Sequence, residues 1–269
     1  MGSRNRSRYW LNVAGWALVA GILLAVSAAA IVRFTMVTMH PGTPNVAHAG
    51  GRIEGRTYTN SIPAFDNAYR RGFRFIEADL QRTADDVVVC GHDWTGFPEE
   101  APVYEAFLRH RQTMAFQPCT FDELVNWFAM HPDAYLVSDP KTDAVEINHR
   151  LYAELGQALV AQAYSALEVR LLTEAGIESV ILTLYRVDGF RILELEELER
   201  SGRSVAGVTM PVASALGGLA LWAKFRLNAP VYAHTVNPCW LLSPLHFLAV
   251  DAIYTDDLGP EGCVSPGQS

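Results

Sequence analysis

The feature that most constrains the fold is an alternation of short apolar runs with helical patterns, which begins near residue 45 and continues to residue 255. Runs rich in β-branched and aromatic residues predict strands. Ser61 followed by Pro63 indicates one helix start, and the sequence TFDE at 120–123 fits a capping box that opens another. The expected strands are residues 45–49, 73–80, 86–90, 134–138, 179–184, 204–209, 231–235 and 252–255.

Repeated strand–helix units predict a parallel sheet with right-handed crossovers. Eight strands in about 220 residues favour an α/β fold of the (β/α)8 TIM barrel type, over residues 45–260 with a short tail at 261–269. An open, doubly wound sheet is the alternative. No GxGxxG or Walker sequence is present to indicate nucleotide binding. The expected helices are residues 61–71, 120–130, 144–164 and 187–200.

An uncharged run over residues 9–32 precedes the alternating pattern. As a helix it would be about 36 Å long at about 1.5 Å per residue, which exceeds the roughly 30 Å of a bilayer's hydrocarbon core. We therefore expect a transmembrane signal-anchor helix at 9–32 and a linker at 33–44. A signal peptide cleaved near the small residues 27–30 is the alternative.

Basic residues mark the side of the membrane on which the chain starts. Arg4, Arg6 and Arg8 precede the uncharged run, so the positive-inside rule makes residues 1–8 a cytoplasmic segment. We therefore expect a single-pass protein of the cytoplasmic membrane whose barrel lies outside the cytoplasm. A cleaved signal peptide would export the barrel as well.

The acidic and basic residues are unevenly distributed along the chain. The net charge is −8, and all 29 acidic residues follow residue 53. Broad nucleic-acid binding requires a basic surface, so we expect no nucleic-acid partner.

Four cysteines occur in the expected barrel, at positions 90, 119, 239 and 263. In an exported protein they can form disulfides, but their spacing leaves the pairing open, and free buried thiols are the alternative. A bridge between Cys90 and Cys119 would tether the long connection between them.

Polar side chains follow the first four expected strands. The carboxyl ends of barrel strands share one face, where TIM-barrel enzymes carry their active sites. We therefore expect these side chains to converge at one site. They are His48, Glu77, Asp79, His92, Asp139 and Lys141.

The residue types at these positions suit phosphate chemistry. Glu77 and Asp79 are two residues apart and face the same way, so their charges repel and favour a bound cation. With Asp139 they form a carboxylate set without thiolates, which suits Mg²⁺ or Ca²⁺. A lysine beside such an ion would neutralise a phosphate, and two histidines would transfer protons.

The motifs that carry these residues resemble one family. HAGG at 48–51, the segment 58–94 with its ExD and HD motifs, HTVNP at 234–238 and VDAIYTDDL at 250–258 resemble the glycerophosphodiester phosphodiesterase family. That family lies in the phosphatidylinositol-specific phospholipase C-like superfamily. The resemblance implies that His48 and His92 are the catalytic acid/base pair and that Lys141 binds the phosphate. It also implies that Asn237 lines the pocket and that the metal ligands are Glu77, Asp79 and Asp139.

The chain departs from the family pattern at three positions. Ala49 replaces an arginine, Thr59 replaces an acidic residue, and Asp139 replaces the more common glutamate. The Asp139–Lys141 arrangement is similar to that of the sphingomyelinase D branch. These departures indicate a divergent branch with a rearranged phosphate site.

The predicted function is a membrane-anchored, metal-dependent phosphoric diester hydrolase for a glycerophosphodiester or a phospholipid-like head group. A catalytically silent barrel that binds a phosphodiester, a lipid head group or a protein partner is the alternative. Trp94 opens a long connection over 94–119, where we expect it to contact the substrate, with an ordinary packed loop as the alternative. His234 lies on a late expected strand and is expected to be a hydrogen-bonded core residue, with a position facing the barrel mouth as the alternative.

Overall fold

The computed structural model describes residues 13, 15–28, 30, 40, 42–98, 100–185 and 191–263. The chain divides into two units, Met1–Met39 and His40–Ser269. In the first unit, residues 13, 15–28 and 30 are helical and exposed. Within the described residues we find no helix whose length and hydropathy would let it span a membrane. The rest of the predicted span 9–32, the segment 1–8, most of the linker and residues 264–269 lie outside the described part.

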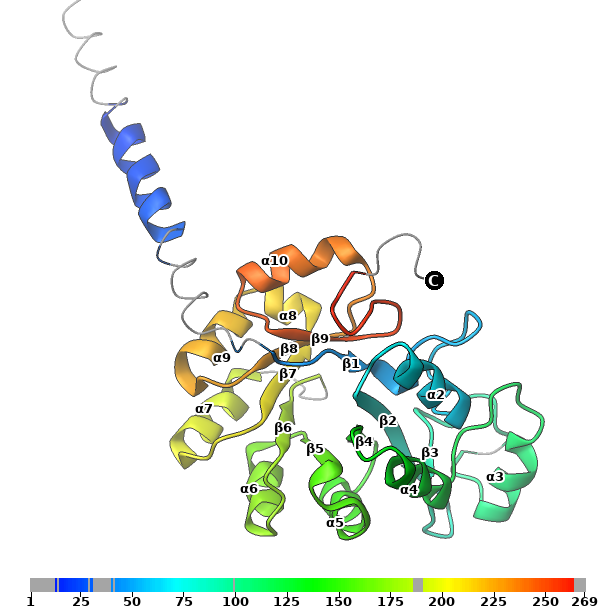
Figure 1. Cartoon of the computed structure of the whole chain (residues 1–269). Helices are drawn as coiled ribbons and strands as arrows, with labels where there is room; N and C mark the ends of the chain where they lie inside the picture. The colour runs from blue at the N-terminus through cyan, green and yellow to red at the C-terminus, as the bar shows by residue number, and fades with distance from the viewer. Residues whose placement is uncertain are drawn as a thin grey trace, which may run out of the picture. The chain divides into compact units, whose positions relative to one another are not determined.

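The second unit contains a closed parallel barrel, as Figure 1 shows. Short β1 pairs with both β2 and β9 and closes the sheet, so the predicted TIM barrel is confirmed and the open sheet is excluded. The eight parallel strands are β1 (Val46–Ala47), β2 (Phe75–Arg82), β4 (Tyr135–Pro140), β5 (Leu159–Ala163), β6 (Val180–Thr183), β7 (Gly207–Pro211), β8 (Val231–His234) and β9 (Ala252–Thr255).

The eight barrel strands are not the eight that the sequence predicted. Strand β3 (Val88–Cys90) pairs antiparallel with β2 and extends a hairpin instead of forming part of the barrel wall. Strand β5 takes its place, although the sequence predicted a helix over 144–164. That helix ends early, because Gly156 adopts a positive φ of 53° directly after Leu155. The run that follows, LVAQA, has only five residues and all of them are buried, so periodicity does not distinguish strand from helix.

Helices cover the outside of the barrel (Figure 1). Ser61 caps the first of them through the N–H of Ala64, and the capping box between Thr120 and Glu123 is present as predicted. The α-helices are α2 (Ile62–Arg70), α3 (Tyr104–Arg111), α4 (Phe121–Met130), α5 (Ala144–Leu155), α6 (Ala166–Glu174), α7 (Arg191–Ser201), α8 (Val212–Leu216), α9 (Leu219–Leu227) and α10 (Leu242–Phe247). Short 3₁₀ turns are η1 (His48–Gly50), η2 (Gly156–Ala158) and η3 (Cys239–Leu241).

Strand β2 shows how the barrel separates its core from its site. Ile76, Ala78 and Leu80 pack in the apolar layer between the strands and the helices. Glu77 and Asp79 alternate with them and therefore face the barrel interior. Below these carboxylates, a second apolar cluster that includes Val137 and Tyr232 fills the interior. The carboxylates of Glu77 and Asp79 thus lie toward the carboxyl end of β2.

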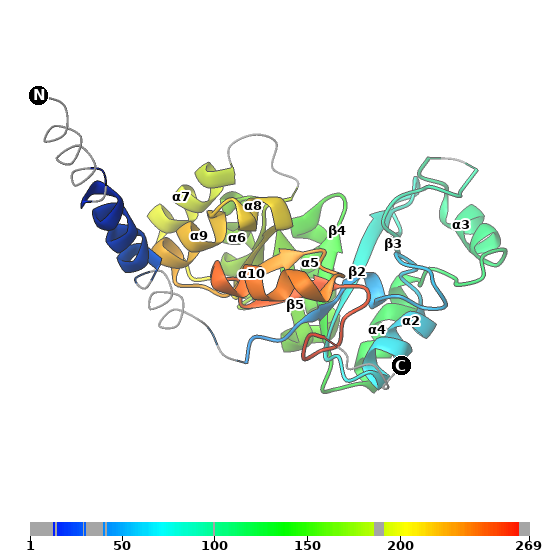
Figure 2. The same cartoon turned by 90° about the horizontal axis from the view of Figure 1, so that it is seen from above.

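Two disulfides brace the connections at the edge of the barrel. Cys90 pairs with Cys119 and Cys239 with Cys263, so the proposed Cys90–Cys119 tether is confirmed and the free-thiol alternative is wrong. The tethered segment contains α3, which lies beside the β2–β3 hairpin in Figures 1 and 2.

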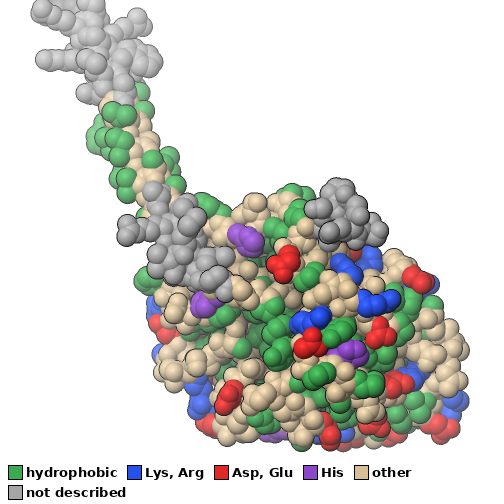
Figure 3. Space-filling view, viewed as in Figure 1, with side chains coloured by type: hydrophobic (Ala, Val, Ile, Leu, Met, Phe, Trp, Pro, Cys, Tyr) green, Lys and Arg blue, Asp and Glu red, His purple; other side chains and the backbone are tan. Residues whose placement is uncertain are grey.

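Charged side chains on the barrel surface are mixed in sign. Figure 3 shows acidic and basic groups interspersed on one face. Arg203 pairs with Glu174, and Arg226 pairs with Glu199. These basic side chains are therefore neutralised by neighbours rather than gathered into one positive surface.

Candidate active site

A cavity of about 110 Å³ opens at the carboxyl ends of the barrel strands. Five of the predicted site residues line it: His48, Glu77, His92, Asp139 and Lys141. Asp79 is completely buried beside Lys141, whereas Trp94 and Asn237 are not part of the cavity wall. The structure thus brings five of the eight predicted site residues together in one cavity wall.

His48 is held by a carboxylate that sequence reasoning missed. Its Nδ1 lies 2.8 Å from Oδ1 of Asp256, which directly follows β9. Asn237 fixes that carboxylate, because its Nδ2 donates to Asp256 Oδ2 and its Oδ1 accepts from the Asp256 N–H, each at 2.8 Å. Asn237 therefore supports Asp256 instead of lining the cavity. Asp256 directly follows the last strand, where barrel enzymes carry active-site residues, and this position could have identified it from the sequence.

The contact with Asp256 determines which edge of His48 faces the cavity. With Nδ1 directed at Asp256, Nε2 points toward Glu77 and lies 3.8 Å from its Oε2. Burial disfavours the charged imidazolium, but the charge of Glu77 and the hydrogen bond to Asp256 outweigh it and raise the pKa of His48. The ring is thus fixed in orientation and surrounded by negative charge.

Lys141 occupies the space between two of the predicted metal ligands. The pairing of β2 with β4 sets Asp79 beside Asp139. The Lys141 ammonium lies 2.7 Å from Asp139 Oδ2, to which it donates a hydrogen bond. It also forms an ion pair with Asp79, with its Nζ 2.5 Å from Asp79 Oδ1. The hydroxyls of Tyr164 and Tyr185 also donate to Asp139.

The departures from the family pattern lie next to the ExD carboxylates. Ala49 adopts a positive φ of 48° and its N–H donates to Glu77 Oε2 at 3.2 Å. Asn60 binds Asp79 twice, through its Nδ2 and through its Oδ1, each at 2.8 Å. Thr59 instead contacts Ser61, so no acidic group enters the site from this turn. Backbone and amide groups thus surround the two carboxylates.

The donor set is chemically suited to a hard divalent cation. Glu77, Asp79 and Asp139 present only oxygen atoms, and burial together with the neighbouring carboxylates raises the pKa of Glu77. Among the described residues, no three histidine, cysteine or acidic side chains are arranged as a metal centre. Lys141 supplies the positive charge between two of these carboxylates. The residues fit a hard cation by type, and Lys141 is the group that such an ion would have to displace.

His92 reaches the cavity from its rim. Strand β3 runs antiparallel to β2, and the N–H of Gly91 donates to the carbonyl of Asp79, so the hairpin returns the chain to the site. The His92 side chain is 44% exposed, and its Nδ1 lies 3.1 Å from Asp93 Oδ2. The ring of Tyr58 stands between the two histidines, with its centroid 4.7 Å from each of theirs.

His234 lies in the cavity wall rather than in a hydrogen-bonded core position. Its buried Nε2 has no hydrogen-bond partner among the described residues, so the sequence-based expectation was wrong. Burial, and next the positive charge of His48, lower the pKa of His234 to about 4. The imidazole is therefore neutral near pH 7.

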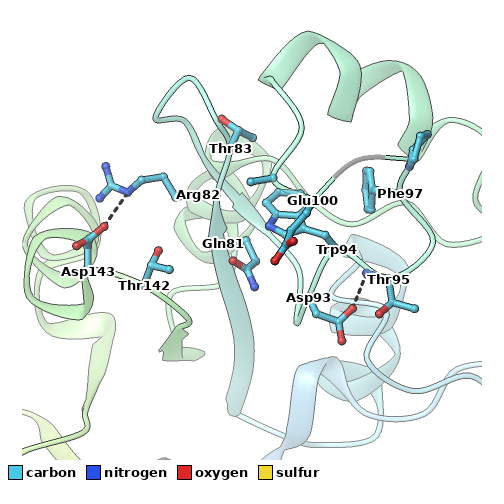
Figure 4. Close-up of a pocket in the computed structure, with 12 residues that line it drawn as sticks. Gln81, Arg82, Thr83, Asp93, Trp94, Thr95, Phe97, Glu100, Thr142 and Asp143 are labelled. Carbon is cyan, nitrogen blue, oxygen red and sulfur yellow. Dashed lines mark hydrogen bonds and ion pairs between the residues drawn. The ribbon is translucent and has the colours of Figure 1, made fainter.

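Trp94 lines two larger pockets outside the cavity. One has a volume of about 520 Å³ and shares Tyr58 and His92 with the cavity. The other, of about 760 Å³, is shown in Figure 4 with Trp94 on one side and Thr142 and Asp143 on the other. The connection after His92 thus forms walls beside the cavity.

Comparisons with known proteins find one matching family model and several similar folds. The model of the glycerophosphoryl diester phosphodiesterase family matches residues 49–99. A glycerophosphodiester phosphodiesterase structure from Parabacteroides distasonis is 18% identical with a TM-score of 0.63, over 79% of this chain and 92% of that one. The corresponding enzyme from Thermotoga maritima is 16% identical with a TM-score of 0.60, over 81% and 96%.

A third similar structure carries a ligand. It is an Oleispira antarctica phosphodiesterase in complex with the product sn-glycerol-3-phosphate, 15% identical with a TM-score of 0.59 over 82% of this chain and 95% of that one. The match of the family model confirms the resemblance predicted from the motifs, and the structures confirm the barrel fold. The named relatives are phosphoric diester hydrolases, the enzyme class expected from the sequence.

Proposed function

We propose that this chain is a metal-dependent phosphoric diester hydrolase that acts on a glycerophosphodiester or a phospholipid-like head group by two-histidine acid/base catalysis. The observation that carries this proposal is the orientation of His48, which Asp256 holds with its Nε2 toward the cavity. Lys141 lines the same cavity, His92 lies at its rim, and three buried carboxylates lie nearby. The family model matches residues 49–99, a range that begins just after His48 and includes Glu77, Asp79 and His92.

The two histidines have different environments and complementary tasks. One accepts the proton of the attacking water or substrate hydroxyl, and the other donates a proton to the leaving alkoxide. His48 is buried and oriented by Asp256, whereas His92 is exposed and adjoins the 520 Å³ pocket. Tyr58 lies between them, so the substrate phosphate displaces this ring when it bridges the histidines.

The carboxylates and Lys141 are proposed to supply the positive charge that a phosphodiester requires. Glu77, Asp79 and Asp139 would hold Mg²⁺ or Ca²⁺, which when bound neutralises phosphate charge and polarises the phosphoryl oxygens. Lys141 then moves from its carboxylate contacts to the phosphate. We expect Lys141→Met to bind Mn²⁺, used as a spectroscopic probe, more tightly than the unaltered chain, because one positive charge leaves the site. Unchanged or weaker Mn²⁺ binding would argue against a metal site at these carboxylates.

The location of the protein remains a proposal drawn from its sequence. The uncharged run at 9–32 and the preceding arginines favour a membrane anchor with the barrel outside the cytoplasm. The two disulfides favour an oxidising compartment. Protease added to intact cells with a permeabilised outer envelope should digest the barrel, and the mass of the mature chain shows whether residues 1–30 are retained. Protection of the barrel from this protease would contradict export.

The decisive experiment is an activity screen on the full chain in detergent micelles. Glycerophosphodiesters and lysophospholipids are tested with Mg²⁺ or Ca²⁺ and with a chelator, and phosphorus NMR distinguishes monoester from cyclic products. We expect turnover that the chelator abolishes and that His48→Ala and Glu77→Ala lower by at least about a thousandfold. His246→Ala, an exposed histidine of α10, is the matched control.

The silent-barrel alternative makes the opposite prediction. It is motivated by the positions where Ala49 and Thr59 replace the arginine and the acidic residue of the family pattern. Tight calorimetric binding of a glycerophosphodiester with no turnover under any metal condition would favour this alternative and exclude the hydrolase.

A further inference from the structure

One sector of the barrel's outer surface is nearly free of charge. Over residues 204–250 the only acidic, lysine or arginine side chains are Lys224 and Arg226. Lys224 is buried in its pair with Asp251, and Arg226 is neutralised by Glu199. The stretch contains α8, α9 and α10, which Figures 1 and 2 show together on one side of the barrel, with α8 in contact with both of the others. We call this surface the α8–α10 sector.

The segment formed by η3 and α10 carries apolar side chains on its outward face as well as its inward face. Leu241 and Leu245 pack into the barrel's main apolar cluster. Trp240, Pro244 and Phe247 are exposed, Trp240 to 72% and Phe247 to 46%. Because Pro244 and Phe247 follow Trp240 by four and seven residues, the three share one helical face, which we call the α10 ridge. A helix that is apolar all round is normally buried all round, so the ridge indicates a further apolar contact.

Two features extend and stiffen the α10 ridge. Leu216 adds an exposed apolar side chain on α8, the helix that contacts α10. The disulfide between Cys239 and Cys263 fixes the residue directly before Trp240. Asn237, which supports the active site, lies three residues before Trp240, so the ridge begins near the mouth of the barrel. A surface held in this way loses little conformational entropy when it makes a contact.

The chain enters the barrel unit at the base of the same sector. The N–H of His40 donates to Asp251 Oδ1 at 2.8 Å, and its Nδ1 contacts the Lys224 ammonium of α9. Asp251 lies between α10 and β9. The uncharged run 9–32 ends eight residues before His40, so the covalent chain keeps its end within about 29 Å of His40. A bilayer that holds the proposed anchor is therefore within reach of the α8–α10 sector.

The chemistry of the sector favours lipid over a protein partner. Tryptophan is enriched at the interface between a bilayer and water, where its ring is apolar and its N–H is hydrated. A typical protein interface has a polar rim with paired charges, whereas Lys224 and Arg226 are already paired within the barrel. For the same reason, attraction to anionic head groups does not contribute here. Burial of apolar side chains is the remaining driving force.

We propose that the α8–α10 sector docks on the surface of a lipid bilayer, with the α10 ridge and Leu216 inserted into its interfacial layer. This inference goes beyond the proposed catalysis and rests on the proposed membrane anchor. The ridge runs from Trp240, near the mouth, to Phe247, after which the chain returns to the amino end of β9. The docked barrel therefore lies on its side, and its cavity opens along the bilayer surface rather than away from it.

Quenching of tryptophan fluorescence by brominated lipid tests this contact. The full chain is reconstituted in phosphatidylcholine vesicles whose lipids carry bromine near the head group. The Trp240 signal is the difference in emission between the unaltered chain and Trp240→Phe. Brominated lipid should lower this signal about twofold or more, because interfacial residues lie about 5–10 Å into the boundary between head groups and acyl chains. Equal Trp240 signals with and without bromine would overturn the proposal.

Phe247→Glu places a charge on the α10 ridge and leaves Trp240 intact. Its Trp240 signal, measured against the same variant with Trp240→Phe, should lose most of the quenching. Leu167→Glu is the matched control, because Leu167 is 49% exposed on α6, which packs against β5 and β6. This control should be quenched as strongly as the unaltered chain. Equal quenching in the two glutamate variants would overturn the assignment of the docking surface.

Lipid charge and oligomeric state identify other occupants. Quenching should be the same with and without phosphatidylglycerol and at low and high salt, because the contact is apolar. Quenching that requires phosphatidylglycerol would overturn the apolar contact. A dimer that Phe247→Glu dissociates, together with no quenching of Trp240, would also overturn the proposal and assign the sector to a second copy of the chain.

Flotation of the vesicles separates failure of the docking surface from failure of the anchor. If the full chain does not float with the vesicles, the anchor fails, and quenching is measured at rising lipid concentration. The sector should still give saturable quenching of Trp240, and Phe247→Glu should weaken the binding about tenfold or more, because burying a phenylalanine contributes about 1.5–3 kcal/mol. No quenching at any lipid concentration would overturn the docking surface. None of these measurements requires turnover, so they are independent of the proposed hydrolase activity.

Discussion

Asp256 Oδ1 lies 2.8 Å from His48 Nδ1, and the carboxylate that makes this contact is itself held by Asn237. A carboxylate behind a histidine fixes its ring and tautomer and stabilises its charged form. Under the proposed function, Asp256 would therefore be a positioning residue that acts through His48.

We expect Asp256→Asn to lower kcat by about tenfold to a hundredfold with little change in KM, because a hydrogen bond to a charged group contributes about 1.5–3 kcal/mol. The limb of the pH–rate profile that reports His48 should also move to lower pH, because the variant removes a carboxylate that raises the pKa of that histidine. Asp257→Asn is the matched control, because its carboxylate pairs with Arg52 at the surface. Equal kinetics and pH profiles for the two variants would refute the positioning role.

The Cys90–Cys119 disulfide closes a loop that contains His92. Both cysteines are buried, and the N–H of Cys90 also donates to the carbonyl of Cys119 at 2.8 Å. Replacing both by serine should lower the free energy of unfolding by about 2–4 kcal/mol and should also reduce activity, since His92 is only two residues beyond Cys90. Urea unfolding and steady-state kinetics measure the two effects.

The second disulfide provides the comparison for this prediction. Cys239–Cys263 spans a similar separation of 24 residues but lies outside the cavity wall. The double serine variant of this pair should lose a comparable free energy of unfolding and keep its kcat at temperatures where it is folded. If the two double variants lose activity alike, the tether has no specific effect on His92.

Two features of the site show how far the sequence could predict it. The motifs predicted that His48, Glu77 and Lys141 lie together, and all three line the cavity, because residues at the ends of neighbouring parallel strands meet at one face. His92 also reaches the cavity, but through an antiparallel hairpin rather than a barrel strand. The local pattern of 86–90 shows only that the segment is extended, and the pairing direction depends on long-range contacts.

The missed features depend on contacts between distant segments. Asp256 and His48 are 208 residues apart, so their contact exists only once β9 closes the barrel against β1. The unpaired nitrogen of His234 is likewise a property of the assembled cavity. No local pattern distinguishes it from a core histidine with a partner.

Glu123 joins the capping box of α4 to an arginine in α3. Both nitrogens of the Arg111 fork donate to its carboxylate at 2.6 Å, and this contact lowers the pKa of Glu123 to about 2. A folded-state pKa below the ordinary value of 4.5 means that the stabilisation is present above about pH 4.5 and disappears as the pH falls toward 2. Glu123→Gln keeps the capping acceptor and removes the charge. The free energies of unfolding of the unaltered chain and of Glu123→Gln should therefore differ at pH 6 and converge near pH 2.

The control for this titration is Glu105→Gln. The carboxylate of Glu105 is 82% exposed and pairs with Arg109 one turn further along α3. Its contribution to the free energy of unfolding should therefore stay below about 0.5 kcal/mol between pH 2 and pH 7. Denaturant unfolding from pH 2 to pH 7 gives both curves. A difference between the unaltered chain and Glu123→Gln that does not change with pH would contradict the assignment.

Lys224 and Asp251 form a buried ion pair at the opposite end of the barrel from the cavity. Their side chains are completely buried, the charged atoms are 2.5 Å apart, and burial lowers the pKa of Lys224. Asp251 also accepts the N–H groups of Val231, where β8 begins, and of His40, which precedes β1. The pair therefore ties together the amino ends of the strands that close the barrel.

Removing one member of such a pair leaves the other charge buried without its counter-charge. We expect Asp251→Asn to lower the free energy of unfolding by about 3–5 kcal/mol, whereas the double variant with Lys224→Met should lose clearly less than the sum of the two single losses. Urea unfolding of the four proteins gives this double-mutant cycle, and kcat of the folded single variants should stay within about twofold because the pair is remote from the cavity. Strictly additive losses would show that the two charges do not stabilise each other.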